Sequence, residues 1–144
     1  MSGRLSRRGF LRGCLGAGAA GALAGWTAGC GGDSTAKRAQ SASIALSQVP
    51  PAVGATYRYV AANRALAAHV PCYCGCGQFE GHQSLWDCFM KEDGEFDEHA
   101  SGCMICLDIA RDVETLSKQG LDVKATRAAI DAKYRQYGPP TRTQ

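Results

Sequence analysis

The sequence lacks the motifs that mark the common catalytic and cofactor-binding sites. It contains no Gly-x-Ser-x-Gly, no His-Glu-x-x-His and no glycine-rich phosphate loop, which excludes the enzyme classes that these motifs identify. It contains no Cys-x-x-Cys-His, so covalent attachment of haem is excluded. No segment alternates apolar and polar residues in the manner of a half-buried strand, and this absence predicts an all-α fold.

Net positive charge is confined to the first thirty residues. The formal net charge is +3, but the basic residues before residue 30 have no acidic counterpart; they are Arg4, Arg7, Arg8 and Arg12. The rest of the chain holds 12 basic and 13 acidic residues, a net charge of −1. Without a basic patch, we expect no binding to nucleic acid. The acidic run at residues 92–98 does not have EF-hand spacing and is interpreted as a solvated loop.

The first thirty residues resemble an export signal. Residues 6–12 resemble the twin-arginine motif through Arg7 and Arg8, and residues 13–29 are uncharged and too weakly apolar for a permanent membrane span. Thr-Ala-Gly before Cys30 resembles a lipobox, which makes Cys30 the expected lipidation site. The alternative is an ordinary signal cleaved near residue 28, and in either case Cys14 is removed. We expect an exported protein, lipid-anchored to the membrane and facing the periplasm or cell exterior.

Composition divides the chain into three parts. Residues 1–29 are predicted to be a twin-arginine lipoprotein signal peptide, and residues 30–55 a flexible linker rich in small and polar residues. Residues 56–144 are predicted to form a cysteine-rich helical domain. At that size the hydrophobic core alone gives marginal stability, so additional cross-links are expected.

Four segments of the domain carry apolar residues at helical spacing, namely 57–69, 85–90, 103–118 and 123–137. Pro71 ends the first helix, because the residue before a proline disfavours the helical conformation. Ser84 and Asp87 approximate a capping box for the second. Gly120 suits the end of the third, and Asp122 can cap the fourth. These signals predict a small bundle of three to four helices with an irregular cysteine-rich loop.

The spacing also predicts which side chains face inward. In the first helix they are Tyr59, Ala62, Leu66 and His69. In the third they are Cys106, Ile109, Val113 and Leu116. In the fourth they are Val123, Ile130, Tyr134 and Tyr137.

Cysteine is the one residue type that is strongly over-represented, with eight in 144 residues. The six in the domain are Cys72, Cys74, Cys76, Cys88, Cys103 and Cys106. The first three alternate with other residues and would project to one side of an extended segment. The last two lie three apart at the start of a predicted helix, on one face, where the helix dipole favours the thiolate.

Residues 71–76 read PCYCGC, and this motif resembles the signature of the bacterial PCYCGC lipoproteins. The residues around His82, Cys88, His99 and the Cys103-x-x-Cys106 pair also resemble that family, and the similarity covers most of the chain after Tyr57. The family has no established function. The resemblance therefore implies kinship and supplies no mechanism.

Three functions remain open for the six thiols. As soft ligands they favour Cu(I), zinc or an iron–sulfur cluster, and the spacing matches neither a zinc ribbon nor a ferredoxin. Cys-x-Cys spacing is typical of copper–thiolate chemistry, so copper is preferred over zinc. His82 and His99 flank the cysteines and can complete a site, whereas His69 is a weaker candidate. The expected partner is then a protein that donates or accepts the metal.

The first alternative is three disulfides that staple a structural or interaction domain without metal; three clustered cysteines face three distant ones. The second is a thiol–disulfide oxidoreductase that uses Cys103 and Cys106. The twin-arginine route exports folded proteins, and this favours a domain that takes up metal before export. The metal-binding interpretation, without catalysis, is therefore preferred.

Overall fold

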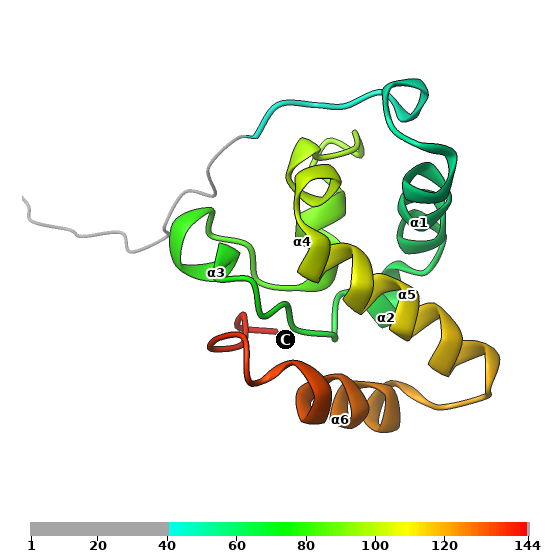
Figure 1. The fold of residues 1–144 in the computed structure, drawn as a ribbon, viewed down its shortest axis with the longest axis vertical. Helices are drawn as coiled ribbons and strands as arrows, with labels where there is room; N and C mark the ends of the chain where they lie inside the picture. Colours follow the sequence, from blue (N-terminus) through cyan, green and yellow to red (C-terminus); the bar gives the residue numbers. More distant parts are fainter. Residues whose placement is uncertain (1–40, 144) are drawn as a thin grey trace, which may run out of the picture. The chain divides into compact units, whose positions relative to one another are not determined.

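The computed structural model describes residues 41–143, and the described chain is helical (Figure 1). Its α-helices are α1 (Pro51–Ala62), α2 (Arg64–Ala67), α3 (Cys76–Phe79), α4 (Leu85–Phe89), α5 (Met104–Lys118) and α6 (Val123–Tyr134). Two 3₁₀ turns are present, η1 (Leu46–Gln48) and η2 (Glu98–Gly102). Between residues 41 and 143 there is no strand, only two isolated bridges. The all-α prediction is confirmed.

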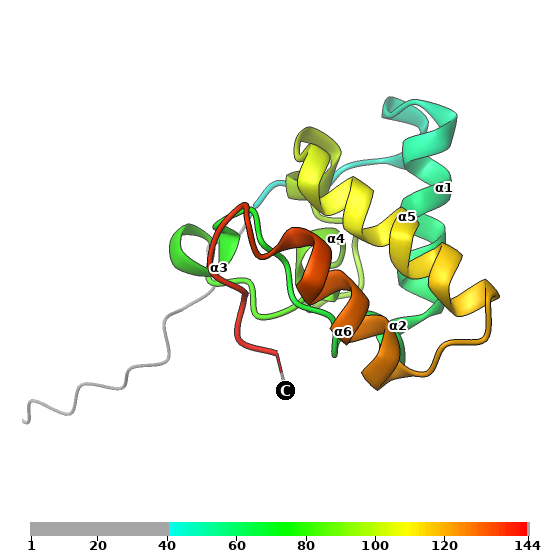
Figure 2. The same ribbon diagram turned by 60° about the horizontal axis from the view of Figure 1, so that its bottom comes forward.

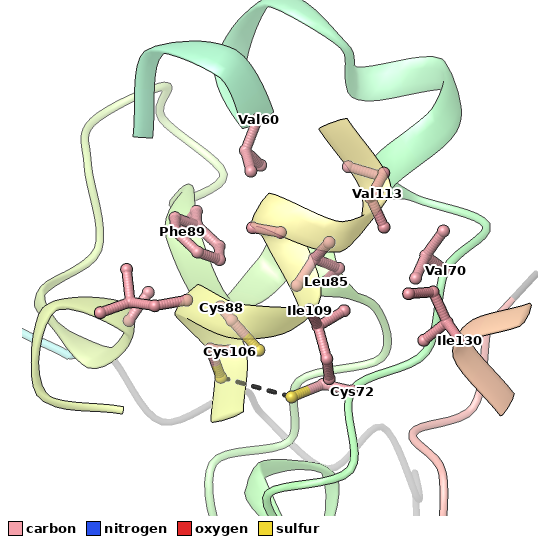
Figure 3. Close-up of a cluster of buried hydrophobic side chains, with 14 of the residues drawn as sticks. Val60, Val70, Cys72, Leu85, Cys88, Phe89, Cys106, Ile109, Val113 and Ile130 are labelled. Carbon is pink, nitrogen blue, oxygen red and sulfur yellow. Dashed lines mark hydrogen bonds between the residues drawn. The ribbon is translucent and has the colours of Figure 1, made fainter. Parts of the chain in front are cut away.

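Helix α5 lies at the centre of the domain and contacts α1, α4 and α6 (Figures 1 and 2). Its buried stripe includes Ile109 and Val113, which belong to the same buried cluster as Leu85 and Phe89 of α4 (Figure 3). The ring of Tyr57 in α1 packs edge-on against Phe89, with ring centroids 4.9 Å apart. The apolar core therefore lies between α5 and the three helices around it.

The first predicted helix differs from the structure in its start and in its inner face. It begins at Pro51, which occupies the first helical turn, where a proline needs no hydrogen-bond donor. It breaks at Asn63, whose side-chain amide donates to the Tyr59 carbonyl at 2.7 Å and separates α1 from α2. The predicted inner face is half right. Tyr59 and Leu66 pack against the core, whereas Ala62 and His69 are exposed. The side chains fully buried in α1 are Tyr57 and Val60.

Residues 41–55 were expected in the flexible linker, but their backbone is part of the folded structure. Ile44 donates to the Phe96 carbonyl at 3.0 Å, and Glu98 donates to the carbonyl of Ala42 at 2.9 Å. The first helix then starts within this segment. The sequence does not predict this folded segment, because its residues are mostly small or polar. Backbone hydrogen bonds hold it more than large apolar side chains do. The predicted export motif at Arg7 and Arg8 and the predicted lipidation site Cys30 lie outside the described residues.

The second, third and fourth predicted helices are present with shifted ends. Ser84 and Asp87 form the capping box of α4, and Asp122 caps α6 by accepting from the Ala125 amide at 2.7 Å. Gly120 has a φ of 84° after α5, as a left-handed helix terminus requires. None of the helices within residues 41–143 is long and apolar enough to cross a membrane.

Two details of the last helices were predicted wrongly. Cys103, predicted as the first residue of the third helix, is instead the N-cap of α5, because residues 98–102 form the η2 turn. Helix α6 ends at Tyr134, so Tyr137 lies beyond it and is 57 % exposed. Val123 is 39 % exposed, and the inward face of α6 is formed by Ile130 and Tyr134.

Candidate metal centre

The PCYCGC segment runs without helix from residue 71 to residue 75 and then starts α3 at Cys76. Gly75 precedes this helix with a φ of 90°, a conformation that side-chain-bearing residues rarely adopt. The reversal at Gly75 places Cys76 on a short helix and leaves Cys72 and Cys74 on the loop before it. Helix α3 was not predicted, since four residues are too few for a periodic signal.

The C-terminal segment fixes the first cysteine of the motif from both sides. The amide of Cys72 donates to the Thr141 hydroxyl oxygen at 2.9 Å, and the Thr141 amide donates to the Cys72 carbonyl at 2.9 Å. Thr141 is only 5 % exposed. This residue cannot be recognised from the sequence, because a threonine in a polar, proline-containing segment gives no signal of a long-range contact.

The five remaining candidate ligands come from α4, η2, α5 and the segment between α3 and α4, which carries His82, and all converge on this loop. Cys88 lies on α4, where its thiol also contacts the Ser84 carbonyl oxygen at 3.6 Å. Cys103 caps α5, and Cys106 lies one turn further along. His99 lies on η2, where its backbone amide donates to the Asp97 carboxylate at 2.8 Å. These contacts position each side chain before any ligand binds.

The four shortest contacts among the sulfurs lie between 3.3 and 3.6 Å. The Cys72 sulfur is 3.3 Å from that of Cys106, a contact drawn as a dashed line in Figure 3, and 3.4 Å from that of Cys74. The sulfurs of Cys76 and Cys88 are 3.4 Å apart, and those of Cys74 and Cys106 are 3.6 Å apart. A disulfide bond is about 2.05 Å long. The structure therefore shows six free thiols where the stapled-domain alternative predicted three disulfides.

The eight residues predicted as ligands all belong to groups whose donor atoms lie within 4.8 Å of one another. The groups are Cys74, His99, Cys103 and Cys106; Cys76, His82, Cys88 and His99; Cys72, Cys74 and Cys76; and Cys72, Cys88 and Cys106. We call these eight residues the thiol–imidazole cluster. His69, the weaker candidate, is exposed and is in none of these groups. The cluster can hold a metal ion.

His82 provides a test of whether the cluster fits a metal. Its side chain is 1 % exposed, and neither Nδ1 nor Nε2 has a hydrogen-bond partner among the described residues. Its ring packs edge-on against that of His99, with centroids 4.8 Å apart. An unpaired polar atom in a protein interior costs about 1–3 kcal/mol, so such atoms are rare. Beside the thiols of Cys76 and Cys88, a metal ion would use one of these nitrogens.

The protons of the cluster are unevenly distributed. The pKa of the Cys74 thiol is well below its ordinary value, because hydrogen bonds from Cys103 and then Cys106 stabilise its thiolate. The pKa of Cys106 is raised by its contacts with Cys103 and then Cys72, although the helix start predicted a thiolate there. Hydrogen bonds to Cys103 and then Cys74 raise the pKa of His99 to about 12. The cluster thus holds thiolate charge beside a cationic imidazole, an arrangement in which a metal cation can replace the protons.

Comparison with known proteins agrees with the motif. A family model described as "Protein of unknown function with PCYCGC motif" matches residues 23–144, which is most of the chain. This chain belongs to the PCYCGC family. No curated protein and no solved structure matches it. Because the family's function is unknown, the chemistry of this PCYCGC protein has to be inferred from its own thiol–imidazole cluster.

Proposed function

We propose that this PCYCGC protein is an exported lipoprotein whose thiol–imidazole cluster binds a soft metal ion, with Cu(I) preferred over zinc. The observation that carries the proposal is His82, which is buried beside Cys76 and Cys88 with both ring nitrogens unpartnered. Thiolates and imidazoles are the ligands that soft and borderline metals prefer. The consequence is a role in metal storage, delivery or resistance, and the protein is not an enzyme.

The crowding of the sulfurs favours copper. Six thiols exceed the four ligands that one zinc ion uses. Soft thiolates select Cu(I), and sulfurs that bridge several Cu(I) ions suit a dense set of thiols.

The first experiment is elemental analysis with parallel thiol counting on the full chain purified after native export. We expect stoichiometric copper and six domain thiols that react with a thiol reagent only after the metal is removed. Zinc in place of copper would overturn the metal preference alone. No metal and no free thiols would overturn the proposal and leave a disulfide-stapled domain.

Membrane attachment rests on the motif at Cys30. We expect Cys30→Ser to move the protein from the membrane fraction to the soluble exported fraction. Cys14→Ser is the matched control, because Cys14 belongs to the segment that export removes. Replacement of Arg7 and Arg8 by lysine should retain the protein in the cytoplasm. Membrane attachment that persists in Cys30→Ser would contradict lipidation at this residue.

Thiol–disulfide exchange is a second candidate, favoured by one observation. Cys103 is half-buried at the start of α5, and its neighbour Cys106 is fully buried three residues later. An accessible thiol with a buried one beside it is the arrangement that thiol oxidoreductases use. If this is the function, Cys103→Ser abolishes reduction of a disulfide substrate and leaves metal content unchanged. If the cluster is a metal site, the same variant lowers metal affinity.

A further inference from the structure

The thiol–imidazole cluster contains more donor atoms than a single metal ion uses. It offers six sulfurs and two imidazoles, each with one ligand atom close to the others. Soft and borderline metals in proteins take two to four such ligands. A single ion would therefore leave at least half of the donors unused, the buried ones among them. The excess points to more than one metal position.

Four of the donors form an outer set. These residues are Cys74, His99, Cys103 and Cys106, whose ligand atoms all lie within 4.8 Å of one another. The imidazole Nε2 of His99 is 3.8 Å from the Cys74 sulfur. His99 also lies within 4.8 Å of Cys76, Cys88 and His82, and its contact with Cys74 and its partial exposure favour the outer set. Three of the four side chains, all except Cys106, are partly exposed to solvent.

The other four donors form an inner set. Cys76, Cys88 and His82 lie within 4.8 Å of one another, and their side chains are 3 %, 0 % and 1 % exposed. The Cys72 sulfur lies within the same distance of both Cys76 and Cys88, and this residue is also fully buried. Each set thus contains three thiols and one imidazole, and the two sets differ chiefly in their access to solvent.

Cys72 joins the two sets. Its sulfur is 3.4 Å from that of Cys74 and 3.3 Å from that of Cys106, both members of the outer set. It is also close to the inner sulfurs of Cys76 and Cys88. A thiolate in this position can bridge two metal ions. Shared thiolates also reduce the negative charge per metal ion that the protein interior has to accommodate.

We propose that the cluster binds two metal ions bridged by the thiolate of Cys72, an inner one on Cys76, Cys88 and His82 and an outer one on up to three of Cys74, Cys103, Cys106 and His99. This inference rests on the proposed metal-binding function and adds that the two ions have different roles. The inner ion is shielded from solvent and is retained. The outer ion lies at the partly exposed side chains and is the one that exchanges with an external donor or acceptor. Each thiol that becomes a ligand releases its proton to water.

The test uses the reduced full chain loaded with Cd²⁺ as a spectroscopic probe of thiolate sites. We expect two bound ions per chain, two cadmium NMR resonances, and scalar coupling between them through the shared sulfur. A chelator should remove the ions in two phases. Cys103→Ser should shift or remove only the resonance of the fast-released outer ion, and Cys88→Ser only that of the slow inner ion. Cys72→Ser should abolish the coupling.

His69→Ala is the control, because His69 is exposed and belongs to neither set; it should leave both resonances unchanged. If Cys88→Ser does not fold, the two resonances and two release phases of the unsubstituted chain still decide the question. One bound ion that both cysteine variants affect equally would overturn the two positions and leave the metal-binding function intact. Failure to bind Cd²⁺, Cu(I) and Zn²⁺ alike would overturn the proposed function itself.

Discussion

Helix α5 serves two regions of the domain that are held together by different interactions. In the middle of the helix, Ile109 and Val113 pack against other buried apolar side chains, so their surfaces are covered by residues of the same chain. Its first turn brings Cys103 and Cys106 to a group of thiols and imidazoles, where His82 has no partner for either ring nitrogen. We call the apolar region around Ile109 and Val113 the helical scaffold. Its packing requires no bound ion or ligand. Under the proposed function the thiol–imidazole cluster is completed by a bound metal ion, so the two regions should respond differently to metal and to substitution.

The largest expected effect is that of metal on the cluster. An ion present at 1,000 times its dissociation constant stabilises the protein by about 4 kcal/mol, which for a domain of this size raises the melting temperature by roughly 15–30 °C. We expect removal of Cu(I) by a chelator to lower the melting temperature by this amount in calorimetry. Far-UV circular dichroism should show the same helix content below the transition, because the scaffold does not depend on metal. A melting temperature that does not depend on metal would contradict the expected difference between the thiol–imidazole cluster and the helical scaffold.

Next in size is a cavity in the helical scaffold. Ile109 is fully buried, and Ile109→Ala should lower the free energy of unfolding by about 2–5 kcal/mol in urea titrations. Metal stoichiometry of the folded variant should stay unchanged. Val123→Ala is the control, because Val123 is 39 % exposed and its truncation should change stability by about 0.5 kcal/mol or less. Loss of metal in folded Ile109→Ala would show that the two regions are not separable.

A smaller effect is expected where the C-terminal segment meets the cluster. Thr141→Val removes the acceptor of the buried Cys72 amide and should cost about 1–3 kcal/mol. Unlike Ile109→Ala, it should also weaken metal binding, because it loosens a ligand; competition with a chromophoric Cu(I) chelator measures this. Thr115→Val, at an exposed hydroxyl on α5, is the matched control. Equal metal affinity in both variants would remove Thr141 from the set of positioning residues.

The smallest effect belongs to the cap of α6. Asp122→Ala removes the carboxylate that accepts from the Ala125 amide and should cost about 1 kcal/mol in thermal unfolding. It should leave Cu(I) affinity unchanged, since the cap lies on the scaffold. Asp108→Ala, which removes only an exposed ion pair with Arg111, should cost less. A change in metal affinity in Asp122→Ala would link the helix end to the cluster.

The sequence predicts the scaffold better than the segments between its helices. Long periodic stretches and local caps such as Ser84 and Asp122 are visible along the chain, and they identify α4, α5 and α6. Failures occur where contacts are distant or elements are short. Asn63 breaks a helix through one side-chain hydrogen bond, and residues 41–48 are held by pairing with residues about fifty positions away.

For the cluster, the sequence names the candidate ligands but not their arrangement. The number and positions of the cysteines can be read from the sequence, whereas the contact of Cys72 with Cys106 depends on how α5 approaches the PCYCGC loop. The unpartnered state of His82 is equally invisible, because burial of a loop histidine depends on the complete fold. Residue identity thus predicts the chemistry, and only tertiary structure shows which donors share an ion.

The pairing of Thr141 with Cys72 has a consequence for the order of events during folding. These residues are 69 positions apart, and Thr141 follows all six helices in the chain. During synthesis the first cysteine of the motif therefore emerges long before the residue that fixes its backbone. The thiols of the nascent chain are present but not yet arranged. If the cluster binds metal as proposed, selective loading begins only after Thr141 has been made, and until then the cysteines need protection from other metals and from oxidation.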